Sequence, residues 1–167
     1  LAHGVKRLVY ISSPSVMTRP IDQWNLTETE PLPDEHVSVY SETKRLGEDR
    51  VRQVAEAAGL ETVILRPKAI YGPGDTTIFP RLIKSAEKGR LPIIGDGNTV
   101  TNLTHVRDVV AAILLALKSE KAVGNVYVVT GGEDLRIWNV ITKVVTRFGF
   151  KAPSRKIPIG RAMRAAK

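Results

Sequence analysis

Cysteine is absent from the 167 residues of the chain. The protein therefore forms no disulfide, has no thiolate nucleophile and cannot build a zinc–cysteine centre. We predict no metal site. A chain without cysteine is compatible with a reducing compartment, and we expect the protein in the cytoplasm.

Long apolar runs are also absent. The longest, at residues 109–117, is far shorter than the ~20 residues that span a bilayer. The first residues, LAHGVKR, lack the layout of a signal peptide, and we expect no membrane partner. They also lack a starting Met, so we expect the chain to be a fragment or a processed product.

Aromatic residues are scarce, at 5% of the chain, whereas Lys and Arg outnumber Asp and Glu by 25 to 17. A basic balance suits nucleic acid or an anionic ligand. The only mild basic cluster lies near the C-terminus, at Arg155, Lys156, Arg161, Arg164 and Lys167. With few rings for base stacking, we predict no nucleic-acid partner and assign part of the charge to an anionic cofactor.

Apolar residues make up 43% of the chain, enough for one domain with a sizeable core, or for one domain and a small lobe. Periodicity and turn signals predict strands that alternate with helices, which is typical of an α/β protein with parallel strands. The predicted strands are 5–12, 61–65, 91–94, 101–105, 125–129 and 156–159. The predicted helices are 41–58, 79–88, 106–119, 135–148 and a basic C-terminal tail; long connections cover 14–39 and 66–75.

Tyr40 and Lys44 are four residues apart at the entry to a predicted helix, so both side chains lie on one face. Ser13 follows a predicted strand, and ligands of parallel sheets bind beyond the carboxyl ends of the strands. The three side chains are therefore candidates for one site.

Carbonyl reduction needs an acid for the developing alkoxide. A free phenol, with a pKa near ~10, is a weak base at neutral pH. An ammonium about 6 Å away favours phenolate by roughly 3 kcal/mol at an effective dielectric of about 20. The pair thus suits proton transfer. The spacing alone is common, and a half-buried ring beside a surface cation explains it equally well.

Four segments together carry a family resemblance. Residues 7–16 (RLVYISSPSV) resemble the strand and serine of the extended short-chain dehydrogenases/reductases, and residues 39–48 (VYSETKRLGE) resemble their Y-x-x-x-K helix. Residues 64–75 (ILRPKAIYGPGD) resemble their segment beside the nicotinamide, and residues 104–110 (THVRDVV) resemble the helix entry of their C-terminal lobe. The segments occur in the family's order and cover nearly the whole chain.

The resemblance implies catalytic roles for Ser13, Tyr40 and Lys44. Ser13 would hold the substrate oxygen, Tyr40 would exchange the proton, and Lys44 would support Tyr40 and bind the cofactor ribose. Ser12 takes the role of Ser13 if the alignment shifts by one; Ser15 is the weaker choice because Pro14 has turned the chain. The implied contacts with NAD or NADP are Ser12, Tyr40, Lys44, Pro67, Lys68, Ala69 and Ile70.

The family's glycine-rich turn for the cofactor pyrophosphate is missing, since no G-x-G-x-x-G or G-x-x-G-x-x-G occurs. The resemblance implies the C-terminal part of a doubly wound, Rossmann-type parallel sheet (residues 1–75) and a small α/β substrate-binding lobe (residues 76–167). A strand near 125–130 would return to the main sheet.

Cofactor affinity is the first testable consequence of the missing turn. We expect this 167-residue chain to bind NAD(H) weakly or not at all, because it holds only the nicotinamide end of the site. Calorimetric titration measures this, and micromolar affinity would contradict the expectation.

Position 101 separates two branches of the family. Sugar-nucleotide epimerases often carry an Arg four residues before the His of the HV motif, where it binds the diphosphate; here that residue is Thr101. This favours a 3β-hydroxysteroid dehydrogenase-like branch, acting on a small-molecule secondary alcohol or ketone of sterol-like or β-keto type. A nucleotide-sugar epimerase or dehydratase and a non-catalytic relative remain alternatives. The helix of Tyr40 would contribute to a homodimer, as in many relatives.

Three further residues receive structural interpretations. His105 opens a helix and is expected to cap it, Trp138 lies in an apolar helical stripe and is expected in the core, and Asp75 is expected to pin its loop.

Overall fold

The computed structural model describes residues 4–165, and their contacts divide the chain into two compact units. Unit 1 comprises residues 1–70 and 104–131; unit 2 comprises residues 71–103 and 132–167. From the sequence we expected a boundary at residue 75, with a single later strand, near 125–130, joining the first part. In the structure, the whole of residues 104–131 belongs to unit 1. Lys167 of the C-terminal basic cluster lies outside the described residues.

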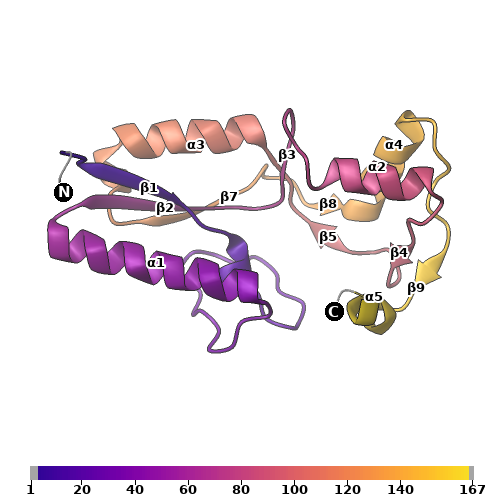
Figure 1. The fold of residues 1–167 in the computed structure, drawn as a ribbon, viewed down its shortest axis with the longest axis horizontal. Helices are drawn as coiled ribbons and strands as arrows, with labels where there is room; N and C mark the ends of the chain where they lie inside the picture. The colour runs from indigo at the N-terminus through magenta and orange to yellow at the C-terminus, as the bar shows by residue number, and fades with distance from the viewer. Residues whose placement is uncertain (1–3, 166–167) are drawn as a thin grey trace. The chain divides into compact units, whose positions relative to one another are not determined.

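Unit 1 is built on a three-stranded parallel sheet in the order β1-β2-β7. The strands are β1 (Arg7–Ile11), β2 (Glu61–Pro67) and β7 (Val126–Val129). Helix α1 (Val39–Ala58) covers one face and α3 (Val106–Lys118) covers the other (Figure 1). The register sets Val9 beside Val63 and Leu65 beside Tyr127. The predicted α/β class with parallel strands is confirmed.

The two faces of this sheet are covered by different kinds of residue. Val63 and Leu65 pack with Ala116 of α3 and with Ala122 in one apolar cluster. Successive residues of a strand point to opposite faces, so Ile64 and Arg66 point toward α1. The fully buried residues of α1 are Ser41 and Glu48, both polar. This apolar cluster therefore lies on the α3 side, whereas α1 itself buries two polar residues.

The ends of α1 are determined locally. Ser38 caps its N-terminus and forms a capping box with Ser41, and Gly59 adopts φ 63° just past its end, a conformation that glycine reaches without strain. The predicted helix over 41–58 is confirmed. It begins two residues earlier than predicted, which places Tyr40 in its first turn.

Among the described residues, unit 2 contains three helices and very short strands that pair with one another. The helices are α2 (Phe79–Glu87), α4 (Ile137–Arg147) and α5 (Ile159–Ala165). Strand β4 (Ile93–Ile94) pairs in parallel with β9 (Lys156–Ile157), and β5 (Val100–Thr101) pairs antiparallel with β8 (Leu135–Arg136).

Several predicted boundaries in this part of the chain were wrong. The strand predicted at 101–105 is two strands, β5 and β6 (Thr104–His105), because β5 pairs with β8 whereas β6 pairs with β3. The helix predicted from residue 135 begins at Ile137, since the preceding pair is used as β8. The loop predicted at 66–75 contains the end of β2 and β3 (Ile70–Tyr71), which pairs with β6.

The described residues also include two single-turn 3-10 helices: η1 (Pro14–Met17) follows β1, and η2 (Glu120–Ala122) follows α3. Within residues 4–165, no helix is long and apolar enough to cross a membrane.

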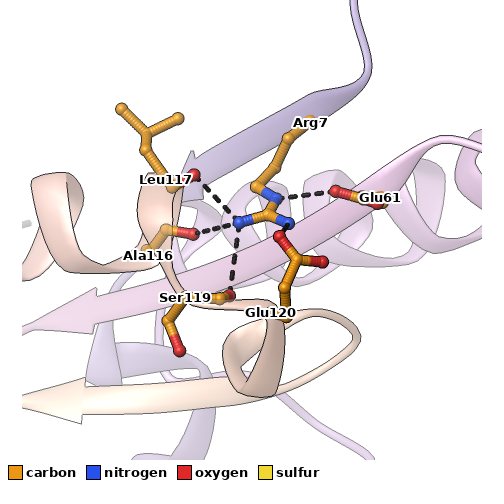
Figure 2. A network of polar contacts seen from close by, with 6 residues as sticks. All are labelled: Arg7, Glu61, Ala116, Leu117, Ser119 and Glu120. Atoms are coloured by element: carbon orange, nitrogen blue, oxygen red, sulfur yellow. Dashed lines mark hydrogen bonds and ion pairs between the residues drawn. The ribbon is translucent and has the colours of Figure 1, made fainter.

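Arg7 joins the first strand to the end of α3 (Figure 2). Its guanidinium donates to Glu61 and Glu120 at 2.7 Å each. It also donates to the carbonyls of Ala116, Leu117 and Ser119 at 3.3, 2.9 and 3.2 Å. A cation at a helix C-terminus satisfies carbonyls that lack intrahelical partners. Arg7 thus fastens α3 to the sheet.

Loss of this guanidinium should destabilise unit 1. We expect Arg7→Met to lower the thermal unfolding midpoint by about 5 °C, because several carbonyls and two carboxylates lose their donor. Differential scanning calorimetry measures the change. Arg50→Met, at an exposed position of α1, is the control and should shift the midpoint by less than a degree or so. Equal shifts in the two variants would contradict the role of Arg7.

Candidate active site

Ser12 and Ser13 lie at the carboxyl end of β1, where sites of parallel sheets form. Ser12 is 4% exposed, and its N–H donates to the Leu65 carbonyl at 2.7 Å. Ser13 is half-buried and begins η1, and its Oγ accepts from the Ser15 N–H at 3.2 Å. A hydroxyl that accepts in this way keeps its hydrogen for a further acceptor. Ser13 is the more accessible of the two serines.

Lys44 brings α1 to the same end of β1. Its Nζ donates to the Ile11 carbonyl at 2.9 Å and lies 5.6 Å from the centre of the Tyr10 ring. An ammonium has three donors, so two remain for other groups. The carbonyl that holds Lys44 immediately precedes the two serines.

Gly47 makes room for the ring beneath Lys44. A Cβ at this position would lie 2.1 Å from the Tyr10 hydroxyl oxygen and 2.9 Å from its Cζ, closer than real contacts allow. The glycine thus admits Tyr10 against α1. The sequence analysis missed this requirement, because a glycine inside a helix signals no partner by itself.

Tyr40 lies one turn before Lys44, in the first turn of α1. Its side chain is 55% exposed, and among the described residues its hydroxyl has no hydrogen-bond partner; only its backbone carbonyl accepts, from Thr43 Oγ1 at 2.9 Å. The phenol is therefore accessible from solution.

The segment from Pro67 to Ile70 is fixed by the strands beside it. The Lys68 N–H donates to the Val129 carbonyl at 3.0 Å, and the Ala69 carbonyl accepts from the Thr104 N–H at 3.2 Å. Thr104 is fully buried, and its hydroxyl lies within hydrogen-bonding distance of the Lys68 and Val129 carbonyls. Ala69 has φ 40°, a left-handed conformation that a non-glycine residue adopts at a cost. The sequence analysis missed Thr104, which only precedes a helix entry in sequence.

A buried ion pair joins α1 to the end of β2. Arg66, 2% exposed, donates to both carboxylate oxygens of Glu48 at 2.8 and 2.7 Å, and Glu48 is fully buried. Arg52 lies 3.7 Å from the same carboxylate. Burial opposes the charge on Glu48, but the hydrogen bonds from Arg66 and the nearby arginine charges outweigh it, so the pKa of Glu48 lies below its ordinary value. The sequence analysis missed this pair.

The structural interpretations of two other residues are confirmed. His105 caps α3, with its Nδ1 accepting from the Arg107 N–H at 3.2 Å. Asp75 accepts from the N–H groups of Thr77, Ile78 and Phe79 at 2.8 to 2.9 Å and so pins its loop to α2. Trp138, expected in the core, is only half-buried; the buried residues of α4 are Ile141 and Val145.

Asp75 should make unit 2 sensitive to acid. Hydrogen bonds from the N–H groups of Ile78, Thr77 and Phe79 lower the pKa of Asp75 from 3.8 to about 2. Its stabilisation is therefore complete above the ordinary pKa and is lost as the pH falls toward 2. We expect Asp75→Asn to lower the unfolding midpoint at about pH 6 and to converge with the wild type near about pH 2. Asp22→Asn, at an exposed position, is the control; a constant difference across this range would contradict the prediction.

Unit 2 contains an apolar cavity of about 480 Å³ between α2 and α4. Its lining residues include Tyr71, Phe79, Ile83, Val140, Val144 and Phe148. Asp75, which also lines it, already accepts three backbone N–H groups. A second hollow in this unit, of about 380 Å³, is lined by Gly89–Pro92 and by Arg155, so the guanidinium-bearing Arg90 and Arg155 both border it.

The family resemblance implies that this part of unit 1 holds the nicotinamide end of NAD or NADP. The Lys44 ammonium has donors beyond the one that it gives to Ile11, and Tyr40 is exposed. The backbone of Lys68 and Ala69 is held in one conformation before any ligand binds. The structure thus brings the predicted Lys44 to the strand end of Ser12 and Ser13.

Comparison with known proteins gives a consistent result. Residues 1–130 match the NAD dependent epimerase/dehydratase family. The chain is 37% identical over 165 residues to the 3beta-hydroxysteroid-dehydrogenase/decarboxylase isoform 2 of Arabidopsis thaliana, covering 93% of this chain and 29% of that protein. It is 34% identical to the 2-alkyl-3-oxoalkanoate reductase of Stenotrophomonas maltophilia, covering 98% of this chain and 51% of that protein.

Solved structures agree with the fold. The UDP-glucuronic acid 4-epimerase of Bacillus cereus, in complex with NAD, matches with a TM-score of 0.77 and 27% identity, covering 91% of this chain and 50% of that chain. The chain thus spans about half or less of the length of these relatives.

Proposed function

Because the chain belongs to the NAD dependent epimerase/dehydratase family, we propose that it carries the catalytic side chains of an NAD(P)-dependent oxidoreductase. The substrate is a secondary alcohol or ketone of sterol-like or β-keto type. One observation carries the proposal: Lys44, on the helix of Tyr40, donates at 2.9 Å to the carbonyl that precedes Ser12 and Ser13.

The three side chains divide the chemistry. Bound NAD(P) supplies the hydride acceptor or donor. The Ser13 hydroxyl donates to the substrate oxygen. In the oxidation direction, Tyr40 takes the hydroxyl proton while the carbon gives up its hydride; in reduction it returns the proton. Lys44 holds the cofactor ribose and supports the charge of the phenolate.

Two features support an apolar substrate. Thr101 offers no charge where sugar-nucleotide relatives place an arginine, and it is used in the ladder with β8. The large cavity of unit 2 is lined mainly by apolar side chains, and its one carboxylate is occupied by backbone donors. The relatives from Arabidopsis and Stenotrophomonas are named for a hydroxysteroid and an oxoalkanoate.

A nucleotide-sugar epimerase or dehydratase is the second candidate. It is favoured by the hollow bordered by Arg90 and Arg155, because guanidinium groups bind diphosphates well. The B. cereus structure is of such an enzyme.

A substrate panel on the full-length protein separates the two. We expect NAD(P)H-dependent reduction of a 3-ketosteroid or β-keto acid, with no turnover of UDP-, GDP- or dTDP-sugars. Turnover of a nucleotide sugar without any ketone reduction would contradict the first candidate and support the nucleotide-sugar enzyme.

A further inference from the structure

Helix α1 is held against unit 1 by a row of polar anchors. Ser41, Lys44 and Glu48 follow one another at three- and four-residue spacing, and so lie on one face. Ser41 closes the capping box, Lys44 donates to the Ile11 carbonyl, and Glu48 binds Arg66. Two apolar residues of the same helix lie outside, with Val39 75% exposed and Leu46 59% exposed, whereas Val51 and Val54 are half-buried.

Lys44 and Glu48 join the same helix to the ends of two neighbouring strands. Lys44 donates to the carbonyl of Ile11, the last residue of β1, and one turn later Glu48 accepts both hydrogen bonds of Arg66. Arg66 immediately precedes Pro67, where the segment expected beside the nicotinamide begins. The ion pair therefore fixes α1 to the end of β2, one turn away from the Lys44 contact with β1.

Stability alone gives little reason for such a pair. Desolvation of two buried charges consumes most of their attraction, and apolar replacements of similar volume are often neutral or stabilising. Among the described residues, the buried atoms Ser12 Oγ and Arg66 Nη1 have no hydrogen-bond partner. The pair does supply two directional hydrogen bonds between α1 and β2. These bonds fix the rotation of the helix about its axis and its position along β2.

We infer that Glu48 and Arg66 are positioning residues that set the place of the Lys44 ammonium on the carbonyl of Ile11. The catalytic consequence rests on the proposed function, because it assigns Lys44 and Tyr40 their roles. The positioning itself is a property of unit 1 and can be measured without cofactor or substrate.

The test replaces both charges, so that neither is left buried alone. In Glu48→Met/Arg66→Met the unfolding midpoint should stay within a few degrees of the wild type. The hydrogen exchange of the Lys44 ammonium, followed by ¹⁵N NMR of the lysine side chains, should accelerate about tenfold or more. That factor corresponds to losing ~1.4 kcal/mol from a charged hydrogen bond.

A matched control lies on the same helix. Arg45 and Asp49 form a partly exposed ion pair one turn apart, with 30% and 37% of their side chains accessible. Arg45→Met/Asp49→Met should leave Lys44 exchange unchanged. Arg66→Lys keeps the positive charge but loses the paired hydrogen bonds of the guanidinium, and it should also accelerate Lys44 exchange. This variant tests the inference if the double methionine variant does not fold.

Unchanged Lys44 exchange in the folded double variant, or equal acceleration in the Arg45/Asp49 control, would overturn the inference. Failure of the proposed function looks different. In that case Lys44 exchange still responds to the ion pair, while the full-length protein reduces no ketone.

Discussion

Replacing Tyr40 by Phe should reduce the turnover of the full-length protein about a thousandfold or more while leaving cofactor affinity unchanged. The variant removes one oxygen atom from an exposed ring, so the fold has no reason to respond. What disappears is the group that exchanges a proton with the substrate oxygen. The Kd for NAD(P)H should stay nearly the same, because the variant keeps the ring of Tyr40 and leaves the other implied contacts, Lys44 and the backbone of Pro67–Ile70, untouched.

The measurement is kcat with the best ketone substrate, together with fluorescence titration of NAD(P)H. Tyr127→Phe is the matched control, because Tyr127 is a partly exposed tyrosine of the same unit, on β7; it should retain near-normal kcat. A Tyr40→Phe protein with wild-type kcat would exclude Tyr40 as the proton-transfer group.

Ser12 and Ser13 can be separated in the same assay. Ser13→Ala should lower kcat because the accessible hydroxyl is lost. Ser12→Ala changes a buried side chain beside Glu48 and should act mainly on stability. The reverse result would move the substrate-binding role to Ser12, the alternative that the sequence left open.

The candidate site could be predicted where its signal is local. Tyr40 and Lys44 are one helical turn apart, and Ser13 directly follows an apolar strand, so local spacing predicts which elements carry them, while their roles stay a prediction. The helix from Val39 to Ala58 was predictable for the same reason, since Gly59 marks its end. Each of these features depends on residues close in sequence.

Glu48, Arg66 and Thr104 could not be predicted in this way. A glutamate in a helix with many charged neighbours has the pattern of a surface residue, and an arginine at a strand end has no periodic signature. The two are 18 residues apart, and only the packing of α1 against β2 brings them together. Two-residue strands such as β5 and β8 are equally hidden, because their pairing comes from contacts between distant segments rather than from alternation.

Glu48→Gln should be the most destabilising single substitution in unit 1, with a loss of roughly 3 kcal/mol or more in the free energy of unfolding. The variant keeps the shape of the side chain but leaves Arg66 as a buried cation. The NH₂ group of the new glutamine side chain faces the guanidinium donors of Arg66. In the wild type, a carboxylate oxygen accepts a hydrogen bond there at 2.7 Å. Arg66 cannot release its proton and has only 2% exposure to recruit water. For a chain of this size, the unfolding midpoint should fall by about 10 °C.

The pH dependence gives this loss a signature. The pKa of Glu48 is lowered in the folded state, where burial opposes the charge and the bonds from Arg66 outweigh it. The wild-type protein therefore holds the full contribution above the ordinary carboxyl pKa and loses it as the pH falls through the lowered value. The wild type and Glu48→Gln should differ most near neutral pH and converge in acid. Asp49→Asn, the adjacent carboxylate with an exposed partner, should change the stability by less than ~1 kcal/mol at any pH. A Glu48→Gln loss no larger than that of Asp49→Asn would mean that water reaches Arg66 and that α1 is held by its other anchors.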